Sequence, residues 1–379
     1  MSIPFLDLGA QDAAIGTELR AAIDEVLRDQ RFILGPHVER FEAAMAAYCG
    51  VRFALGVASG TDALVLALAA LAGGRNDAAV VTTPFSFFAT ASSIVRAGLR
   101  PVFADIEPRT MNMDPAAADA AVAESSWPVI GLLPVHLFGR LAPMAALQTL
   151  ATRAGLWIVE DAAQAVGARD AGGAAGSFGR AGCLSFYPTK NLGALGDGGM
   201  VLTSDAGLAA HIRRERHQGQ PVPYEHTSMG LCSRLDAVQA AALGVKLRYL
   251  DAWNARRRAI AAAYAAAFTG SGLAAPQGPI GLPEPAGDAH VFHQFVVRVP
   301  ERDRLRAAFE GAGIGTQVYY ARPLHLQPAL ADLGLRPGAF PEAERAAGEV
   351  LALPIYPELP SAHVDTVVET ARRFYAGGA

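Results

Sequence analysis

Lys190 is the residue of this sequence most suited to amine chemistry. The 379-residue chain carries 32 lysines and arginines, and only Lys190 and Lys246 are lysines. Arginine replaces lysine wherever only a positive charge is needed, but a guanidinium does not lose its proton and attack a carbonyl as an amine does. Lys190 therefore predicts a carbonyl-binding amine, with random loss of the other lysines as the alternative. Lys246 lies in a helical pattern and is interpreted as structural.

A carboxylate and an amide follow an apolar run that predicts a strand over 156–160. Asp161 and Gln164 come directly after it, at the strand end where open α/β sheets bind ligands. A buried aspartate there could keep a pyridinium nitrogen protonated, so that a pyridoxal ring accepts electrons. Gln164 could then bond the ring's phenolate oxygen. The alternative is an ordinary aspartate that caps the next turn.

Three further positions could hold a phosphate. Gly60 and Thr61 follow a predicted strand and open a helix, where backbone N–H groups and the helix dipole favour an anion. Ser185, five residues before Lys190, adds a hydroxyl. A plain helix cap at 59–62 would give the same pattern. Aromatic residues at 85–88 lie at a strand-to-helix turn, where one ring could stack on a flat cofactor or belong to the core.

The apolar pattern predicts an α/β protein with one large, mostly parallel sheet of seven strands. The expected strands are 55–58, 79–82, 101–104, 129–133, 156–160, 183–186 and 200–203, and the helices between them are 62–71, 89–97, 143–153 and 206–215. A long helical pattern over 234–267, interrupted near Asp251, leads to a strand at 291–299 and a helix at 302–311. We therefore predict a large cofactor-binding domain over 1–250, with an N-terminal helical segment, and a smaller C-terminal α/β domain over 251–379.

Composition excludes several classes of function. A net charge of −4 and a pI near 6.1 supply no basic field for nucleic acid or an acidic membrane surface. We see no export signal at the N-terminus and no apolar run of membrane-spanning length. The three cysteines are widely spaced and include no CxxC pair, which favours a reducing compartment and argues against a zinc site. We expect a cytoplasmic protein without a metal.

The order of the motifs resembles the DegT/DnrJ/EryC1/StrS sugar aminotransferases, which are pyridoxal-phosphate enzymes of fold type I. The resemblance extends over nearly the whole chain. It rests on Pro4-Phe-Leu-Asp-Leu, Phe32-Ile-Leu-Gly-Pro, Ser59-Gly-Thr-Asp-Ala-Leu, Pro134-Val-His-Leu-Phe-Gly, Glu160-Asp-Ala-Ala-Gln, Ser185-Phe-Tyr-Pro-Thr-Lys-Asn-Leu-Gly, Ser233-Arg-Leu-Asp and Pro323-Leu-His-Leu-Gln-Pro.

The resemblance implies a role for each candidate residue. Lys190 would bind the cofactor covalently, Asp161 would pair with the pyridine nitrogen, Gln164 would contact the phenolate, and Phe87 would stack on the ring. Gly60, Thr61 and Ser185 would hold the phosphate. It further implies a homodimer with shared active sites, glutamate as the amino donor, and a nucleotide-linked keto sugar as the acceptor.

The wording of Ser233-Arg-Leu-Asp and Leu324-His-Leu-Gln is most similar to members that aminate a 3-keto dTDP- or UDP-sugar. Sugar-dehydrating relatives carry histidine in place of the lysine, so Lys190 favours transamination. A pyridoxal-phosphate lyase or dehydratase, and a non-catalytic regulator that keeps the fold, remain the alternatives.

Two places depart from the family pattern. Relatives have asparagine where this chain has Cys232, and they supply it to the cofactor phosphate across the dimer interface; a thiol is a poorer donor than an amide. Relatives also have His-Tyr-Pro where this chain has Tyr319-Tyr320-Ala321. By the resemblance, Tyr224, Tyr319 and His325 would contact the sugar nucleotide, and sequence alone leaves them as loop or interface residues.

Overall fold

A seven-stranded sheet forms the centre of the larger part of the molecule. The computed structural model describes residues 2–377. The strands are β1 (Phe53–Val57), β2 (Ala79–Thr82), β3 (Arg100–Phe103), β4 (Val129–Leu133), β5 (Trp157–Asp161), β8 (Ala181–Ser185) and β9 (Gly199–Thr203). Their order is β1-β9-β8-β5-β4-β2-β3. Only β9 runs antiparallel to its neighbours, so the predicted mostly parallel sheet of seven strands is confirmed.

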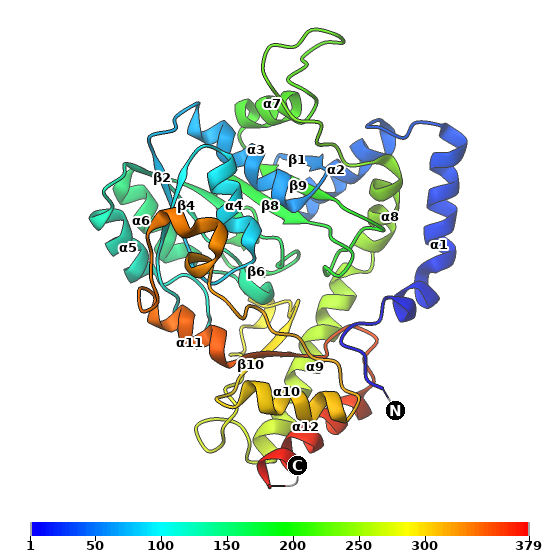
Figure 1. The fold of residues 1–379 in the computed structure, drawn as a ribbon. Helices are drawn as coiled ribbons and strands as arrows, with labels where there is room; N and C mark the ends of the chain where they lie inside the picture. The colour runs from blue at the N-terminus through cyan, green and yellow to red at the C-terminus, as the bar shows by residue number, and fades with distance from the viewer. Residues whose placement is uncertain (1, 378–379) are drawn as a thin grey trace.

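Helices cover both faces of the sheet (Figure 1). They are α2 (Pro36–Cys49), α3 (Gly60–Ala72), α4 (Phe88–Arg96), α5 (Pro115–Glu124), α6 (Met144–Ala154), α7 (Ala206–Glu215) and α8 (Ala237–Leu247), and α1 (Leu8–Asp29) packs against α8. Alternate residues of β9 show the two layers, because successive strand side chains point to opposite faces. Met200 and Leu202 share a buried cluster with residues of α2 and α8, whereas Val201 packs with α3 and α7.

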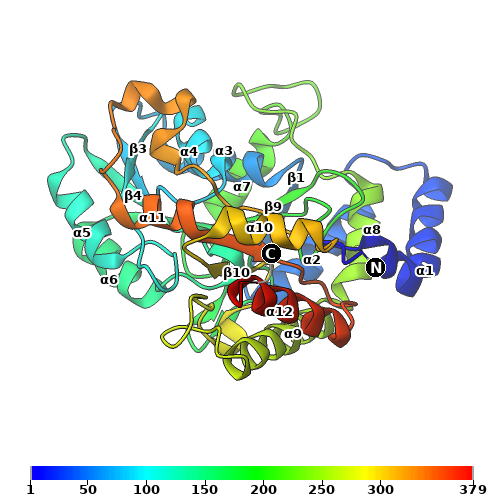
Figure 2. The same cartoon turned by 60° about the horizontal axis from the view of Figure 1, so that its bottom comes forward.

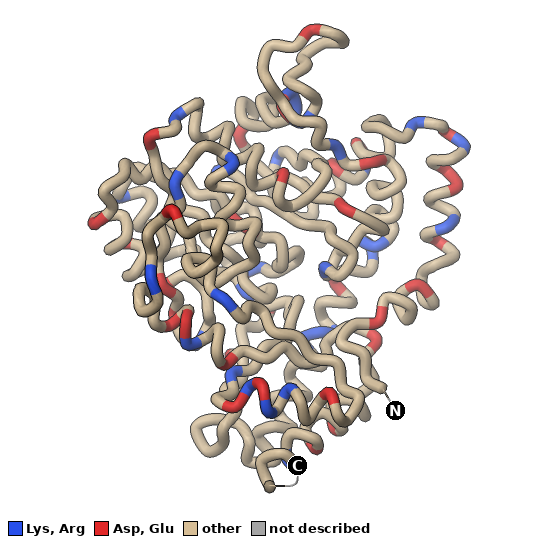
Figure 3. The backbone as a smooth tube through the Cα atoms, viewed as in Figure 1, with Lys and Arg blue, Asp and Glu red and all other residues tan. Residues whose placement is uncertain are grey.

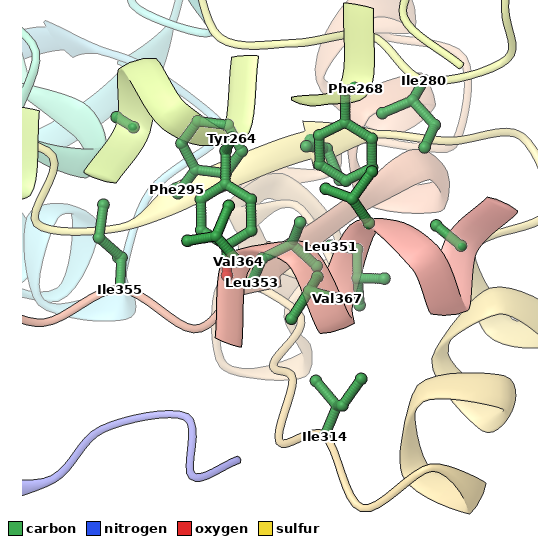
Figure 4. Packing of buried hydrophobic residues seen from close by; sticks show 14 of the residues in the cluster. Tyr264, Phe268, Ile280, Phe295, Ile314, Leu351, Leu353, Ile355, Val364 and Val367 are labelled. Carbon is green, nitrogen blue, oxygen red and sulfur yellow. The ribbon is translucent and has the colours of Figure 1, made fainter. Parts of the chain in front are cut away.

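A second core lies in the C-terminal part of the chain. It is built from α9 (Leu250–Gly270), β10 (Phe295–Arg298), α10 (Arg302–Gly311), β11 (Val350–Leu353) and α12 (Ser361–Tyr375), and α11 (Pro341–Glu349) directly precedes β11 in the chain. These elements gather on one side of the molecule (Figure 2). Tyr264, Phe268, Phe295 and Leu351 meet in the buried centre (Figure 4). The N-terminal Ile3 joins this core.

Two helices form the connection between the two cores, and the strand that follows them is shorter than expected. The helical pattern over 234–267 divides into α8 and α9 at Arg248 and Tyr249, three residues or fewer from the expected break at Asp251. The strand expected over 291–299 is limited to β10, which pairs antiparallel with β11. The domain boundary at residue 250 stays a prediction.

The surface carries no single-sign charge field in the described chain. Lysine and arginine are interspersed with aspartate and glutamate along the backbone (Figure 3). None of the helices within residues 2–377 combines the length and the apolar character that crossing a membrane requires. The segment between α7 and α8 extends away from the rest of the molecule (Figure 1).

Candidate active site

Asp161 is buried at the carboxyl end of β5, a central strand of the sheet. Its Oδ2 accepts a 2.8 Å hydrogen bond from Thr90 Oγ1 on α4, and its Oδ1 accepts one from the Ala163 amide. Burial raises the pKa of this carboxyl, while these hydrogen bonds and the charge of Lys190 act in the opposite direction. A cation beside a buried carboxyl stabilises its ionised form. The protonated nitrogen of a bound ring would supply such a cation.

A fully buried pair behind Asp161 fixes the end of β5. Glu160 Oε2 bonds His136 Nε2 at 2.8 Å, and Glu160 Oε1 accepts from the amides of Phe178 and Gly179 at 2.7 Å. The Ala142 amide donates to His136 Nδ1, so the proton of a neutral imidazole lies on Nε2 and points to Glu160. His136 therefore supports the strand end from behind.

Lys190 lies on the turn that follows β8, the strand that pairs with β5. Its backbone N–H donates to Tyr187 O at 2.8 Å. The side chain is partly exposed, but the surrounding protein removes enough water from the amine to lower its pKa to about 8, against the opposing effect of Asp161. A lysine with this pKa is partly neutral near pH 7 to 8, as a nucleophilic amine requires.

Gln164 and Tyr320 form a polar contact beside Asp161. Gln164 Oε1 accepts from the Phe138 amide at 2.6 Å, and its Nε2 donates to Tyr320 Oη at 3.0 Å. The second N–H of the amide is left for a ring oxygen. Phe87, at the start of α4, has its ring centroid 6.3 Å from that of Tyr320 and is 58% exposed. Its exposed face is suited to stacking on a flat ring.

Tyr320 is a site residue that the sequence analysis missed. It adjoins Tyr319, which was proposed instead, and its ring also contacts Phe85. The Tyr-Tyr pair in the place of the family's His-Tyr was the available signal, but only the fold shows which of the two tyrosines reaches Gln164.

An anion cradle lies where α3 begins. The Ser59 side chain caps α3 by accepting from the Asp62 amide, so the Gly60 and Thr61 amides are at the positive end of the helix dipole. A Cβ built on Gly60 would lie 2.7 Å from Ser185 Cβ. The closeness of Gly60 and Ser185 brings backbone N–H groups and two hydroxyls to one place, a combination that suits a phosphate. These residues, with Lys190 and Asp161, fit pyridoxal phosphate.

Cys232 is exposed, and its sulfur accepts from Arg234 Nη2 at 2.8 Å. The next residue, Ser233, is buried, donates to Asp62 Oδ2 at 2.7 Å and accepts from the Ala58 amide. The segment with Cys232 is thus tied to the first turn of α3, next to the cradle. Its role toward a phosphate stays a prediction.

The three proposed sugar contacts lie in different surroundings. Tyr224 is 95% exposed on the segment between α7 and α8. Tyr319 is half-buried, with its ring 5.6 Å from that of Tyr320. His325 is buried and bonds Glu344 at 3.1 Å. Within residues 2–377, no hydrogen bond or ring contact joins Tyr224 or His325 to Asp161, Gln164 or Lys190. The roles of Tyr224 and His325 toward a sugar therefore stay predictions.

The fold and the site together indicate one class of enzyme. In this class, a large α/β domain places a lysine of lowered pKa, a buried aspartate and an anion cradle at the ends of the sheet strands. The model of the DegT/DnrJ/EryC1/StrS aminotransferase family matches residues 13–372. The chain belongs to this family, and the predicted family, fold and transaminase class are confirmed.

Named relatives cover the whole chain. The pleiotropic regulatory protein of Geobacillus stearothermophilus is 47% identical, with 99% of each chain covered. A dTDP-3-amino-3,4,6-trideoxy-alpha-D-glucose transaminase of Streptomyces venezuelae is 43% identical over 98% of this chain and 96% of its own. A UDP-N-acetyl-3-dehydro-alpha-D-glucosamine 3-aminotransferase of Acidithiobacillus ferrooxidans is 41% identical over 99% of both.

A solved structure is similar over the same extent. The crystal structure of S. venezuelae DesV in complex with a ketimine intermediate superposes with a TM-score of 0.93 at 42% identity and covers 98% of both chains.

Proposed function

We propose that this chain is a pyridoxal-phosphate aminotransferase that converts the 3-keto group of a nucleotide-linked sugar into an amine, with glutamate as the donor. The observation that carries the proposal is that Lys190 follows β8, the strand paired with β5, at whose end the buried Asp161 lies; burial lowers the pKa of the lysine to about 8. The named relatives that act at carbon 3 of dTDP- and UDP-sugars support the substrate class.

Pyridoxal phosphate supplies an aldehyde and an electron-accepting ring when bound. Asp161 would pair with the ring nitrogen and keep it protonated, and the free N–H of Gln164 would bond the ring oxygen. Phe87 would pack on the ring, and Gly60, Thr61 and Ser185 would bind the phosphate. The exposed ring of Phe87 and the cradle at the start of α3 are the observations that support these roles.

Lys190 moves the protons. In the first half of the reaction, its neutral amine would take a proton from the nitrogen-bearing carbon of glutamate and pass it to the cofactor carbon that carried the aldehyde. In the second half, the same amine would take a proton from that cofactor carbon and deliver it to the sugar carbon that becomes the amine carbon. An amine of pKa about 8 is close enough to neutral pH to act in both directions, because general acid–base catalysis is most efficient near the operating pH.

The proposed enzyme is a homodimer located in the cytoplasm. Side chains on the segment between α7 and α8 support the dimer: Met229 is fully exposed, Tyr224 is 95% exposed and Val222 is 50% exposed. Apolar side chains gathered on a projecting segment favour burial against another chain. In the proposed dimer, a second copy covers this segment and shares the active sites, as the resemblance to the family implies.

The test uses a panel of keto sugars. The protein loaded with pyridoxal phosphate is incubated with glutamate and the 3-keto and 4-keto forms of dTDP- and UDP-sugars, and the amine product is followed by mass. We expect amination of a 3-keto sugar by the wild type and none by Lys190→Arg. Amination only of a 4-keto sugar would overturn the position, and dehydration would indicate a lyase or dehydratase. Binding without any turnover would indicate a regulator, as the name of the Geobacillus relative suggests for that protein.

A further inference from the structure

The side chain of Asn254 on α9 connects two segments of the candidate active site. It is 2% exposed, and its Oδ1 accepts a 2.8 Å hydrogen bond from Asn191 Nδ2. Its Nδ2 donates to Val166 O at 3.1 Å. Asn191 directly follows Lys190, and Val166 lies two residues after Gln164. One amide from the helix that begins the second core therefore joins the lysine turn to the glutamine loop.

The space around this amide is closely fitted. A Cβ built on Gly167, which has a φ of +89°, would lie 2.5 Å from Asn254 Nδ2. Asn191 is held from a second side, because its Nδ2 also donates to Val291 O at 3.2 Å and its Oδ1 lies 3.2 Å from His293 Nδ1. The residue after Lys190 is thus fixed by partners from α9 and from the segment at 291–293.

Asp161 and His293 lie near Lys190, and Arg257 lies near His293. Asp161 attracts the charged amine. His293 is buried, and burial, with the charges of Lys190 and Arg257, holds its pKa well below the usual value, so it is neutral. Arg257 is buried and donates to the carbonyls of Phe292 and His293. Lys190 therefore lies near a neutral His293 and the buried Asp161. The protonation of its amine depends mainly on how far the amine is buried.

We propose that Asn254 is a positioning residue for Lys190, which keeps the amine at a fixed depth between Asp161 and the Gln164 loop. The inference rests on the proposed role of Lys190 and extends it to a residue of α9 that touches neither substrate nor cofactor. Without the amide of Asn254, the buried Asn191 Nδ2 keeps only its bond to Val291 O, and the Val166 carbonyl loses its side-chain donor. The turn relaxes, and the amine becomes more hydrated.

The low lysine count gives a direct readout. Protein labelled with ¹³C-lysine and prepared without cofactor contains two labelled residues, Lys190 and Lys246, so the two Cε signals report both pKa values. The wild-type amine of Lys190 is expected to titrate at about 8. In Asn254→Leu we expect this pKa to rise by about one unit toward the ordinary value near 10.4, because hydration favours the charged form. We also expect about tenfold weaker binding of pyridoxal phosphate.

A matched control separates positioning from general loss of stability. Tyr264 lies on the same helix, is fully buried and donates its hydroxyl to Pro354 O at 3.0 Å. Tyr264→Phe removes one buried hydrogen bond from α9 without touching the lysine turn, and it should leave the pKa of Lys190 unchanged. Because Asn254 acts on Lys190 through Asn191, adding Asn254→Leu to Asn191→Leu should shift the pKa no further than Asn191→Leu alone.

Two results would overturn the proposal. One is an unchanged pKa of Lys190 in folded Asn254→Leu, and the other is an equal shift in Tyr264→Phe. If Asn254→Leu does not fold, the pKa of Lys190 is measured in Asn254→Ser, in which the smaller side chain leaves space for water. The same two results would then overturn the proposal. The titration needs neither cofactor nor sugar, so a wild type that fails to aminate any sugar refutes the proposed function and not the role of Asn254 in setting the Lys190 pKa.

Discussion

Gly60 lies against Ser185 so closely that a Cβ built on Gly60 would be 2.7 Å from Ser185 Cβ and 3.3 Å from its hydroxyl oxygen. The contact joins the first residue of α3 to the last residue of β8, two elements that are far apart in the chain. A side chain at residue 60 would occupy the place where the helix N–H groups and the Ser185 hydroxyl converge.

We expect Gly60→Ala to weaken cofactor binding by at least tenfold. The added methyl must displace Ser185 or the start of α3, because real Cβ atoms do not approach to 2.7 Å, and the phosphate then loses part of its cradle. The dissociation constant for pyridoxal phosphate, measured by absorbance, checks this. Gly348→Ala is the control: its Cβ meets nothing within 4 Å in a helix, so binding stays unchanged while stability rises by about 0.5–1 kcal/mol. Equal affinity of Gly60→Ala and the wild type for pyridoxal phosphate would show that the cradle does not hold the phosphate.

The hydroxyl of Thr90 helps to keep Asp161 ionised. Burial raises the pKa of Asp161, and the hydrogen bond from Thr90 lowers it. Thr90→Val removes that bond, so the pKa rises further and a larger fraction of the carboxyl is neutral at pH 7. A hydrogen bond to a charged group contributes about 1.5–3 kcal/mol, which corresponds to at least about tenfold in cofactor affinity. The loss should be smaller at higher pH, and Thr90→Ser should bind as the wild type does. A pH-independent loss would contradict this explanation.

Tyr320, and not Tyr319, is hydrogen-bonded to Gln164, the residue proposed to contact the cofactor ring. Tyr320→Phe removes the 3.0 Å hydrogen bond from Gln164 Nε2, so the amide is held only through the bond that its Oε1 accepts from the Phe138 amide. A neutral hydrogen bond contributes about 0.5–1.5 kcal/mol, so we expect a two- to tenfold loss of pyridoxal-phosphate affinity, roughly, by the same relation between energy and binding. In Tyr319→Phe the cofactor affinity should be kept. If Tyr319→Phe lowers cofactor affinity more than Tyr320→Phe does, the roles of the two tyrosines are reversed.

The lowered pKa of Lys190 predicts the direction in which the free energy of unfolding changes with pH. The folded protein releases the proton at about pH 8, whereas the unfolded chain keeps it to about 10.4. Between these values the unfolded state binds more protons, so the free energy of unfolding rises with pH. Compared with Lys190→Met in urea, the cofactor-free wild type should be relatively least stable below pH 8, and the difference should shrink as pH rises through this window. A constant difference from pH 7 to 10 would show that the amine is not desolvated.

The sheet and the main acid–base residues were predictable from local pattern. Short apolar runs specified the seven strands, and Asp161 and Gln164 follow one of them directly. Lys190 was marked by the scarcity of lysine. These signals are local because a buried strand must be apolar and a residue just beyond it lies at the sheet edge.

The supporting residues were not predictable in the same way. Thr90 is 71 residues from Asp161, and Tyr320 is 156 residues from Gln164. Asn254 lies on a helix whose pattern indicated only packing. Each reaches the site through the arrangement of whole elements, and a single polar residue in a helix or loop carries no mark of its distant partner.

Reductive fixation of the cofactor tests the central claim most directly. The protein is mixed with pyridoxal phosphate, treated with borohydride and digested, and the modified peptide is identified by mass. The structure predicts a cofactor fixed to Lys190 in the wild type and none in Lys190→Arg, with Lys246 unmodified because its buried amine donates to Gly193 O. Fixation at Lys246, or at neither lysine, would contradict the account.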